Sequence, residues 1–201
     1  MLLKLSKVLF IFYLINLSYS QTSTCQTNNG GAAADCNLIK ENFIFTTELL
    51  THNQFKTPQN KFRAIVYKAP AQATGKIILA GAVGNWDNSA APFTADAGHS
   101  FAKTVEHVVG NNPSVKFLAY NNMPPAIPNV KTKSNSKGII ILSTAADSAA
   151  WVVHTIPGFP TAKTPYAWPA SETARGHLLI CLTIAKSQIN AIGLYLNIQN
   201  N

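Results

Sequence analysis

The stretch Ser134–Ile184, SNSKGIIILSTAADSAAWVVHTIPGFPTAKTPYAWPASETARGHLLICLTI, decides the fold of this chain. It contains three short apolar runs rich in β-branched residues, and such runs predict strands. The runs are Gly138–Leu142, Ala150–His154 and His177–Ile184. A Ser-Asn-Ser-Lys-Gly turn opens the first run and brings Asn135 and Lys137 to its start. The function of the chain therefore depends on what these two side chains can do together.

The segments on either side of this stretch predict further strands and two helices. The additional strands are expected at Phe62–Lys68, Lys76–Ala80 and Val115–Tyr120. A helix is predicted over Asp96–Val109 with Asp96 as its N-cap, and apolar residues at helical spacing predict a second one between Ile189 and Leu196. Leu38–Leu50 fits either a strand or a short helix. Strands interleaved with helices predict an α/β or α+β domain, a mixed sheet with flanking helices.

The beginning of the chain predicts export. Residues 1–20 combine a basic start, an apolar run and small residues, which is typical of a secretory signal cleaved after Ser20. A signal anchor is the alternative, although the apolar run is short for a bilayer span. Residues 21–60 are expected to form a leader with the first elements, and residues 61–201 a single domain. The mature protein is expected to be secreted and to have no contact with the membrane.

The mature chain is basic. Without Lys4 and Lys7 of the signal, 14 of the 16 basic residues remain against 8 acidic ones, a net charge of +6. An excess of this size attracts phosphate backbones, but it is equally compatible with ordinary solubility. The charge by itself favours nucleic acid only slightly.

Three cysteines in an exported chain allow one disulfide and leave one thiol over. Cys25 and Cys36 lie close together in a polar segment, whereas Cys181 lies inside an apolar run. A bridge from either residue to Cys181 would tie the N-terminal segment to the core. The alternative is a local bridge between Cys25 and Cys36, with Cys181 as a buried apolar residue.

Familiar catalytic and metal-binding motifs are absent from the sequence, including the Walker loop, His-Glu-x-x-His, Gly-x-Ser-x-Gly and Cys-x-x-Cys. The five histidines are scattered, so neither a metal nor another cofactor is expected. Trp151, Tyr166 and Trp168 could stack on nucleic-acid bases. Aromatic residues so close to strands and prolines nevertheless belong more often to the core.

Several short motifs, in order and with similar spacing, resemble the first half of deoxyribonuclease II. They are VYKAP at 66–70, FLAYNNMPP at 117–125, NSKGIIIL at 135–142, AWVVHTIPGFP at 150–160, PYAWP at 165–169 and RGHLLICLTI at 175–184. The resemblance runs in register from Lys61 to Gln199. It implies that Cys25 pairs with Cys181 and that Cys36 is the odd thiol.

The resemblance also implies one half of a phospholipase D-like fold. Such enzymes cut phosphodiesters without metal, and each of two similar halves contributes a His-x-Lys motif to a shared site. One histidine attacks phosphorus, the other protonates the leaving oxygen, and the lysines neutralise the non-bridging oxygens. Deoxyribonuclease II hydrolyses DNA in this way at acid pH. DNA is therefore the implied partner, and secretion or a lysosome-like compartment the implied location.

The chain departs from the family pattern at its most reactive position. Asn135 stands where the first motif histidine is expected, while Lys137 and Gly138 match and are the expected phosphate contacts. Ser143 replaces the family's aspartate at the far end of the strand, and the sequence ends before a second His-x-Lys motif. His154 matches another family histidine. Its expected role is an auxiliary residue of the site, and the alternative is a buried histidine bonded to the backbone.

These departures decide the functional hypothesis. An amide nitrogen has no basic lone pair, so Asn135 can neither attack phosphorus nor carry a proton. We expect a secreted deoxyribonuclease II-like protein that is catalytically impaired at a degenerate site of Asn135, Lys137 and His154 but still binds DNA or phosphate. A homodimer would supply two asparagines. The alternatives are an active acid endodeoxyribonuclease without metal and a secreted interaction protein on a nuclease scaffold.

Overall fold

The computed structural model of the chain describes residues 23–28, 63–79, 86–88, 91–110, 112–130 and 134–200. Its strands are β1 (Arg63–Lys68), β2 (Lys76–Leu79), β3 (Asp87–Asn88), β4 (Val115–Asn121), β5 (Lys137–Ser143), β6 (Ala149–His154) and β7 (His177–Ile184). Its helices are α2 (Ser100–Val109), η2 (Ala170–Ala174), η3 (Lys186–Gln188) and α3 (Ile189–Asn200). The expected signal, the segment Leu38–Leu50 and Cys36 lie outside the described residues.

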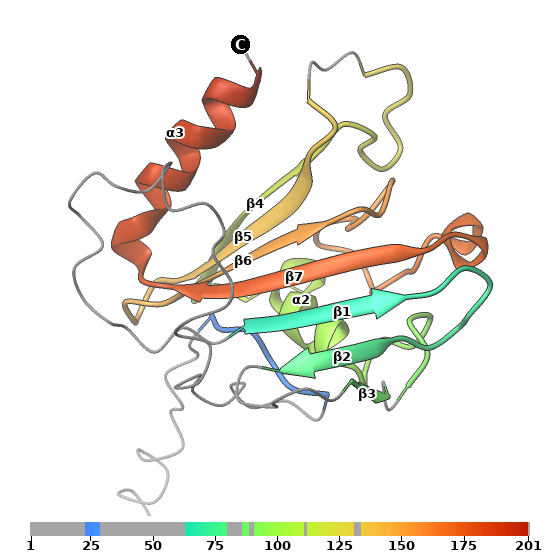
Figure 1. Ribbon diagram of the computed structural model, residues 1–201. Helices are drawn as coiled ribbons and strands as arrows, with labels where there is room; N and C mark the ends of the chain where they lie inside the picture. Colours follow the sequence, from blue (N-terminus) through green and yellow to red (C-terminus); the bar gives the residue numbers. More distant parts are fainter. Residues whose placement is uncertain are drawn as a thin grey trace, which may run out of the picture.

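The described strands form one seven-stranded sheet in the order β3-β2-β1-β7-β6-β5-β4. Each neighbouring pair is antiparallel. Helix α2 packs against one face of this sheet, and α3 extends from the end of β7 beyond the sheet (Figure 1). The predicted class, a sheet with flanking helices, is confirmed. No helix in the described part of the chain has the length and apolar character needed to cross a bilayer.

The strand predictions are confirmed to within one residue at their ends. Only β3 has no counterpart among them, because it comprises two residues, Asp87 and Asn88, that carry no apolar pattern. Its backbone pairs with the beginning of β2, where Lys76 Nζ also donates to Asn88 Oδ1 at 2.6 Å. Pairing with a neighbour, and not local preference, defines this strand.

The predicted start of α2 is wrong by four residues. The helix begins at Ser100, and its N-cap is His99, whose Nδ1 accepts the N–H of Ala102 at 3.2 Å. Gly98 just before it has a φ of 79°, a left-handed conformation that glycine adopts without strain. This turn separates the exposed Asp96 from the first amides of the helix. A buried imidazole therefore takes the capping role that was expected of a carboxylate.

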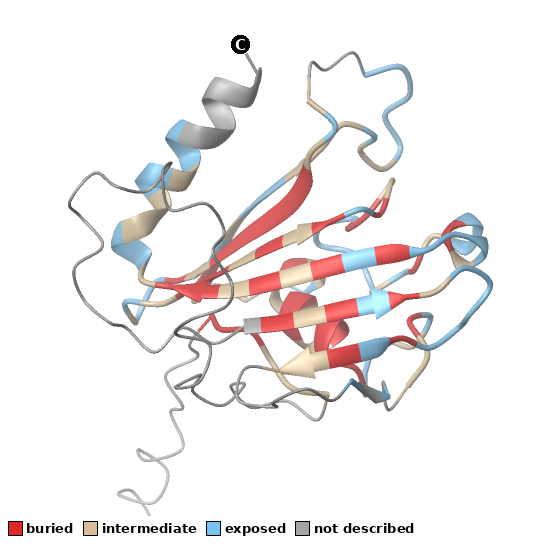
Figure 2. Ribbon diagram, in the orientation of Figure 1, coloured by how far each residue is buried: buried red, intermediate tan, exposed pale blue. Residues whose placement is uncertain are grey.

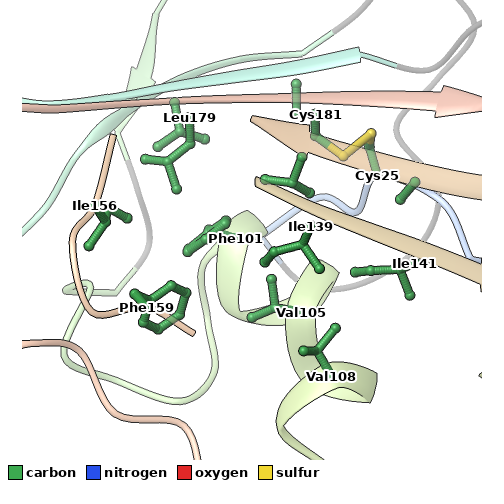
Figure 3. Packing of buried hydrophobic residues seen from close by; sticks show 14 of the residues in the cluster. Cys25, Phe101, Val105, Val108, Ile139, Ile141, Ile156, Phe159, Leu179 and Cys181 are labelled. Carbon is green, nitrogen blue, oxygen red and sulfur yellow. A yellow bond between two sulfur atoms is a disulfide. The ribbon is translucent and has the colours of Figure 1, made fainter. Parts of the chain in front are cut away.

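The core lies between α2 and one face of the sheet (Figure 3). Phe101, Val105 and Val108 of the helix are at most 3% exposed and face Ile139 and Ile141 of β5. Each large apolar side chain buried in this way contributes roughly 1.5–3 kcal/mol relative to an exposed one. The helical spacing of these three residues is thus explained by the face that they bury.

The opposite face of the sheet is less covered. Along β7 the burial alternates, with His177, Leu179 and Cys181 buried, and the residues between them are more accessible. Figure 2 shows the same alternation along β1 and β7, where Tyr67 and Leu178 are 44% and 40% exposed. We call the side that contacts α2 the core face and the other side the outer face.

A disulfide ties the N-terminal segment to the middle of the sheet. Cys25 and Cys181 are bonded, with their Cα atoms 5.8 Å apart and 156 positions apart in the sequence. The backbone N–H of Cys25 also donates to Thr183 Oγ1 at 2.9 Å. This is the pairing that the family resemblance implied. It excludes the local bridge between Cys25 and Cys36.

Candidate functional site

Five polar residues lie on the core face at one end of the sheet, one on each of five strands. We call this set the polar row, and it consists of Asn121 (β4), Lys137 (β5), His154 (β6), His177 (β7) and Lys68 (β1). The last four are buried, with exposures between 0% and 6%. Because polar side chains are seldom buried without partners, the bonds of each member decide what it can do.

The register of the strands brings the members of the polar row together. Asn121 pairs with Lys137, and Lys68 pairs with His177. The pair Gly138 and Val153 sets β5 against β6, so that the residues beyond them, Lys137 and His154, are also neighbours. Directly paired residues of antiparallel strands point to the same face. The row is therefore a consequence of strand pairing and is not visible in any single motif.

Lys137 binds the asparagine that stands in the motif. Its Nζ lies 3.1 Å from Asn135 Oδ1 and 3.4 Å from the Asn135 carbonyl oxygen. An ammonium group has three hydrogens, so one remains without a protein acceptor in the described part of the chain. Burial lowers the pKa of Lys137, and the nearby Glu172 carboxylate partly opposes this shift. Among the described residues no carboxylate lies within ion-pair distance of Lys137.

His154 is a hydrogen-bond donor without an acceptor. Its Nδ1 accepts the N–H of Ile156 at 3.2 Å, so in the neutral ring the proton is on Nε2. Nε2 is buried and has no partner among the described residues. Burial lowers the pKa of His154 to about 3, with smaller contributions from the positive charges of Lys137 and His177. The ring therefore stays neutral, with Nε2–H as a donor, well into the acid range.

His177 is held on both sides of its ring. Nδ1 lies 3.1 Å from Thr155 Oγ1, which itself accepts the N–H of Leu178 at 3.1 Å. Nε2 lies 3.1 Å from Glu172 Oε2, an ion-pair distance, although the two atoms are out of line for a hydrogen bond. Burial lowers the pKa of His177, the Glu172 carboxylate opposes this shift, and the Lys68 ammonium adds to it.

Lys68 is bonded at all three of its hydrogens. Its Nζ donates to the carbonyl oxygens of Ala69, Thr173 and Arg175 at 3.2, 2.8 and 2.6 Å. Two of these carbonyls belong to η2 and the residue after it, more than one hundred positions away in the sequence. Burial lowers the pKa of Lys68, and Glu172 opposes the shift. The ammonium therefore fastens η2 to the end of β1.

Glu172 is the acidic member of the site and comes from η2, which lies at the junction of β1 and β7 (Figure 1). It is 2% exposed. Its Oε1 accepts from Arg175 Nη1 at 2.8 Å and from Ser171 Oγ at 3.1 Å. In the described part of the chain no group of three His, Cys, Asp or Glu side chains could hold a metal ion.

Two of the residues expected to bind substrate lie elsewhere. Ser143 is at the opposite end of β5 from Lys137, about 20 Å away at the rise of an extended strand. Its hydroxyl accepts the N–H groups of Ala145 and Ala146 at 3.2 and 3.1 Å and so caps the turn into β6. The strand places Ser143 too far from Lys137 for both to contact one phosphate group.

Gly138 follows Lys137 directly but belongs to the outer face. A Cβ at this position would run into the Tyr120 hydroxyl and the carbonyl oxygen of Val152. That hydroxyl also accepts the indole N–H of Trp151 at 3.0 Å. Packing of Tyr120 against the strand therefore requires the glycine, whatever binds to the core face.

The aromatic residues that could have stacked on bases divide between core and outer face. Trp168 is 8% exposed and its ring lies 5.1 Å from that of Phe93. Tyr166 donates from its hydroxyl to the Phe93 carbonyl at 2.8 Å, and burial raises its pKa. For these two residues the core interpretation is confirmed. Trp151 is partly accessible on the outer face, on the side away from Lys137.

The sequence pointed to Asn135, Lys137 and His154, which the structure places near one another. It did not point to the other polar residues around them. Lys68 carried a usable signal, because it continues the buried face of Ala64 and Val66 at the last position of its strand. A lysine at this position places its ammonium group next to the core, where it needs hydrogen-bond partners. The carbonyl groups of Thr173 and Arg175 that bind Lys68 carried no comparable signal, because no pattern in the sequence near them places η2 beside β1.

Comparison with known proteins identifies relatives of this chain. The family model described as Deoxyribonuclease II matches residues 64–201. The chain is 27% identical over 138 residues to deoxyribonuclease-2-alpha of Sus scrofa, covering 62% of this chain and 37% of the relative. It is 30% identical over 143 residues to plancitoxin-1 of Acanthaster planci, covering 64% and 39%. The chain thus spans less than two fifths of the length of these relatives.

Proposed function

Because the chain belongs to the deoxyribonuclease II family, we propose that it is a secreted, catalytically impaired relative that retains phosphate and DNA binding. The observation that supports this most directly is the contact between Lys137 Nζ and Asn135 Oδ1 at 3.1 Å. A carboxamide oxygen occupies the place beside the lysine where a phosphodiesterase of this type needs an imidazole.

The neighbouring histidine does not replace the missing one. His154 presents Nε2–H, a donor, while the lone pair on Nδ1 is engaged by the N–H of Ile156. With a pKa of about 3 it accepts no proton at the pH of an acidic compartment. The loss of general acid–base catalysis alone typically lowers a rate about 10²- to 10⁴-fold. Without a nucleophile, the covalent route of the family is closed, and a homodimer would add only a second Asn135.

Phosphate binding needs less than catalysis does. Lys137 retains one hydrogen without an acceptor, and His154 offers a second donor nearby. Hydrogen bonds from charged or buried donors to phosphate oxygens are among the stronger ones in proteins. The basic excess of the chain, 16 basic against 8 acidic residues in the full sequence, supports the same partner.

A second function, an active acid endonuclease, is favoured by one observation. His177 Nε2 lies 3.1 Å from the buried carboxylate of Glu172, and a carboxylate beside a histidine is one of the two contacts that an oriented general base needs. A third function, a secreted interaction protein, is favoured by the accessible apolar side chains Tyr67 and Leu178 on the outer face. Neither of these two functions explains why Lys137 and His154 keep hydrogen-bond donors without acceptors.

A plasmid-nicking assay at acid pH without metal tests the impairment. We expect no nicking above background by the purified protein, and the Asn135→His variant tests whether an imidazole at this position restores some. Robust nicking by the unmodified protein that disappears in His177→Gln would establish the second function instead.

DNA binding is tested by a salt series with the same protein. We expect affinity to fall steeply with ionic strength, as contacts to phosphates require. The Lys137→Met variant should bind more weakly and reduce the salt slope by about one contact. The matched control is Lys116→Met, because Lys116 is exposed on the outer face. Absence of binding at low salt would contradict the proposal.

A further inference from the structure

We propose that the Lys137–His154 site takes the terminal phosphate monoester of a nucleic-acid strand, in preference to the internal phosphodiester of an unbroken one. This inference rests on the proposed function, because it uses the same two donors. It goes further by naming the chemical form of phosphate that the site accepts.

The first reason is access. Lys137 is 6% exposed and His154 is 3% exposed, and the donor atom of His154 is fully buried. An internal phosphodiester is flanked by a sugar on both sides and must lie along the surface of a protein. A terminal phosphate has a single ester link and can enter end-on, away from the rest of the strand. Donors below the surface therefore favour the terminal group.

The second reason is the set of donors that remain open. A monoester presents three non-bridging oxygens, and the site offers one ammonium hydrogen of Lys137 and the Nε2–H of His154. The exposed Asn135 directs its oxygen to Lys137, which leaves its amide N–H₂ group as a further donor at the rim. The three side chains belong to two neighbouring strands and the turn before them.

The third reason is charge. A phosphate monoester carries about −1.5 to −2 charges near neutral pH, whereas a diester carries a single charge. The buried ammonium of Lys137 has only neutral oxygens as partners. Glu172, the nearest acidic residue of the site, is engaged by Arg175 at 2.8 Å and faces His177 at 3.1 Å. An ammonium that lacks a carboxylate partner binds the more highly charged phosphate more strongly.

The experiment compares single-stranded oligonucleotides of one sequence that differ only at their ends. The probes carry a 3′-phosphate, a 5′-phosphate or hydroxyls at both ends, and a circular single strand has no end. We expect a phosphate-ended probe to bind at least tenfold more tightly than the hydroxyl-ended probe and the circle, in fluorescence anisotropy at fixed salt. Comparison of the 3′-phosphate and 5′-phosphate probes shows which end of the strand binds. Excess orthophosphate should displace the tighter-binding phosphate probe and not the hydroxyl-ended one.

Two variants connect this preference to the site. Lys137→Met should abolish the difference between phosphate and hydroxyl ends, while Lys116→Met should retain it. Asn135→Asp changes an exposed position and places a carboxylate against the Lys137 ammonium. It should abolish the difference as well, because the carboxylate would pair with the ammonium and repel the phosphate. Since Asn135 is exposed, this variant keeps the test valid even if Lys137→Met fails to fold.

The possible failures are distinct. Equal binding of all four probes, weakened by Lys137→Met, would overturn the preference for ends and leave the proposed DNA binding intact. Absence of binding to every probe at low salt would overturn the proposed function itself. An end preference that survives both Lys137→Met and Asn135→Asp would show that the terminal phosphate binds elsewhere, and would also overturn the inference.

Discussion

The polar row contains two pairs of lysine and histidine that look alike in sequence but differ in their bonds. Lys68 and His177 lie side by side at one end of the row, and every hydrogen of Lys68 is bonded to a carbonyl. Lys137 and His154 lie toward the other end, and each retains a donor without an acceptor among the described residues. Lys68 fastens η2 to the end of β1, whereas Lys137 and His154 keep donors that no described residue accepts from.

The difference shows that burial alone does not identify a functional residue. All four side chains are at most 6% exposed, yet His177 Nε2 lies 3.1 Å from the Glu172 carboxylate, whereas His154 Nε2 has no polar partner among the described residues. Buried donors that lack partners cost about 1–3 kcal/mol each, and a ligand that supplies acceptors recovers this cost. Three measurements test the distinction between the two pairs. They are the pH dependence of the free energy of unfolding, the stability of the two lysine variants, and the effect of replacing Ser143.

The largest expected effect is the acid sensitivity contributed by His154. The unfolded chain takes up a proton near pH 6.5, whereas the folded ring, with a pKa of about 3, does not, so the free energy of unfolding falls as the pH drops between these values. The full difference corresponds to about 5 kcal/mol at about 1.4 kcal/mol per pH unit. Urea unfolding at pH 7 and pH 4 should show a smaller loss in His154→Phe than in the unmodified protein. Equal losses in both proteins would refute the depressed pKa.

Replacement of the two lysines should separate their roles. Lys68→Met would remove three hydrogen bonds, to the carbonyl oxygens of Ala69, Thr173 and Arg175, and should lower the free energy of unfolding by roughly 2–4 kcal/mol, measured by urea denaturation at neutral pH. Lys137→Met removes a buried charge that has no carboxylate partner, and its stability should change by less than about 1 kcal/mol. If the two variants were equally destabilised, Lys137 would be a structural residue like Lys68.

The smallest expected effect is at Ser143. Its hydroxyl accepts two backbone N–H groups at the turn into β6, so Ser143→Ala should cost about 1 kcal/mol of stability. The affinity for DNA and for phosphate ends should not change, because the residue lies at the far end of β5 from Lys137. If Ser143→Ala weakened binding but left the free energy of unfolding unchanged, Ser143 would be a ligand-binding residue and not only a turn cap.

Much of the fold could be predicted because its strands are short apolar runs that end at glycine, proline or polar residues. The pattern failed where a partner defines the element, as in β3, and where a buried side chain replaces the expected cap, as with His99 in place of Asp96. The site was predictable only in part for the same reason. Asn135, Lys137 and His154 belong to recognisable motifs, whereas Lys68, Glu172 and His177 meet through pairings between distant segments.

The sequence by itself determined the chemistry of the side chains and the periodicity of the strands. It placed a carboxamide beside Lys137 in a family where an imidazole is expected, and no folding can make an amide nitrogen basic. Only the tertiary structure decided which donors stay open, because two of the three carbonyls that accept from Lys68 lie 105 and 107 positions away in the chain. A hydrogen bond between such distant residues depends on the register of the whole sheet, which no local stretch of sequence contains.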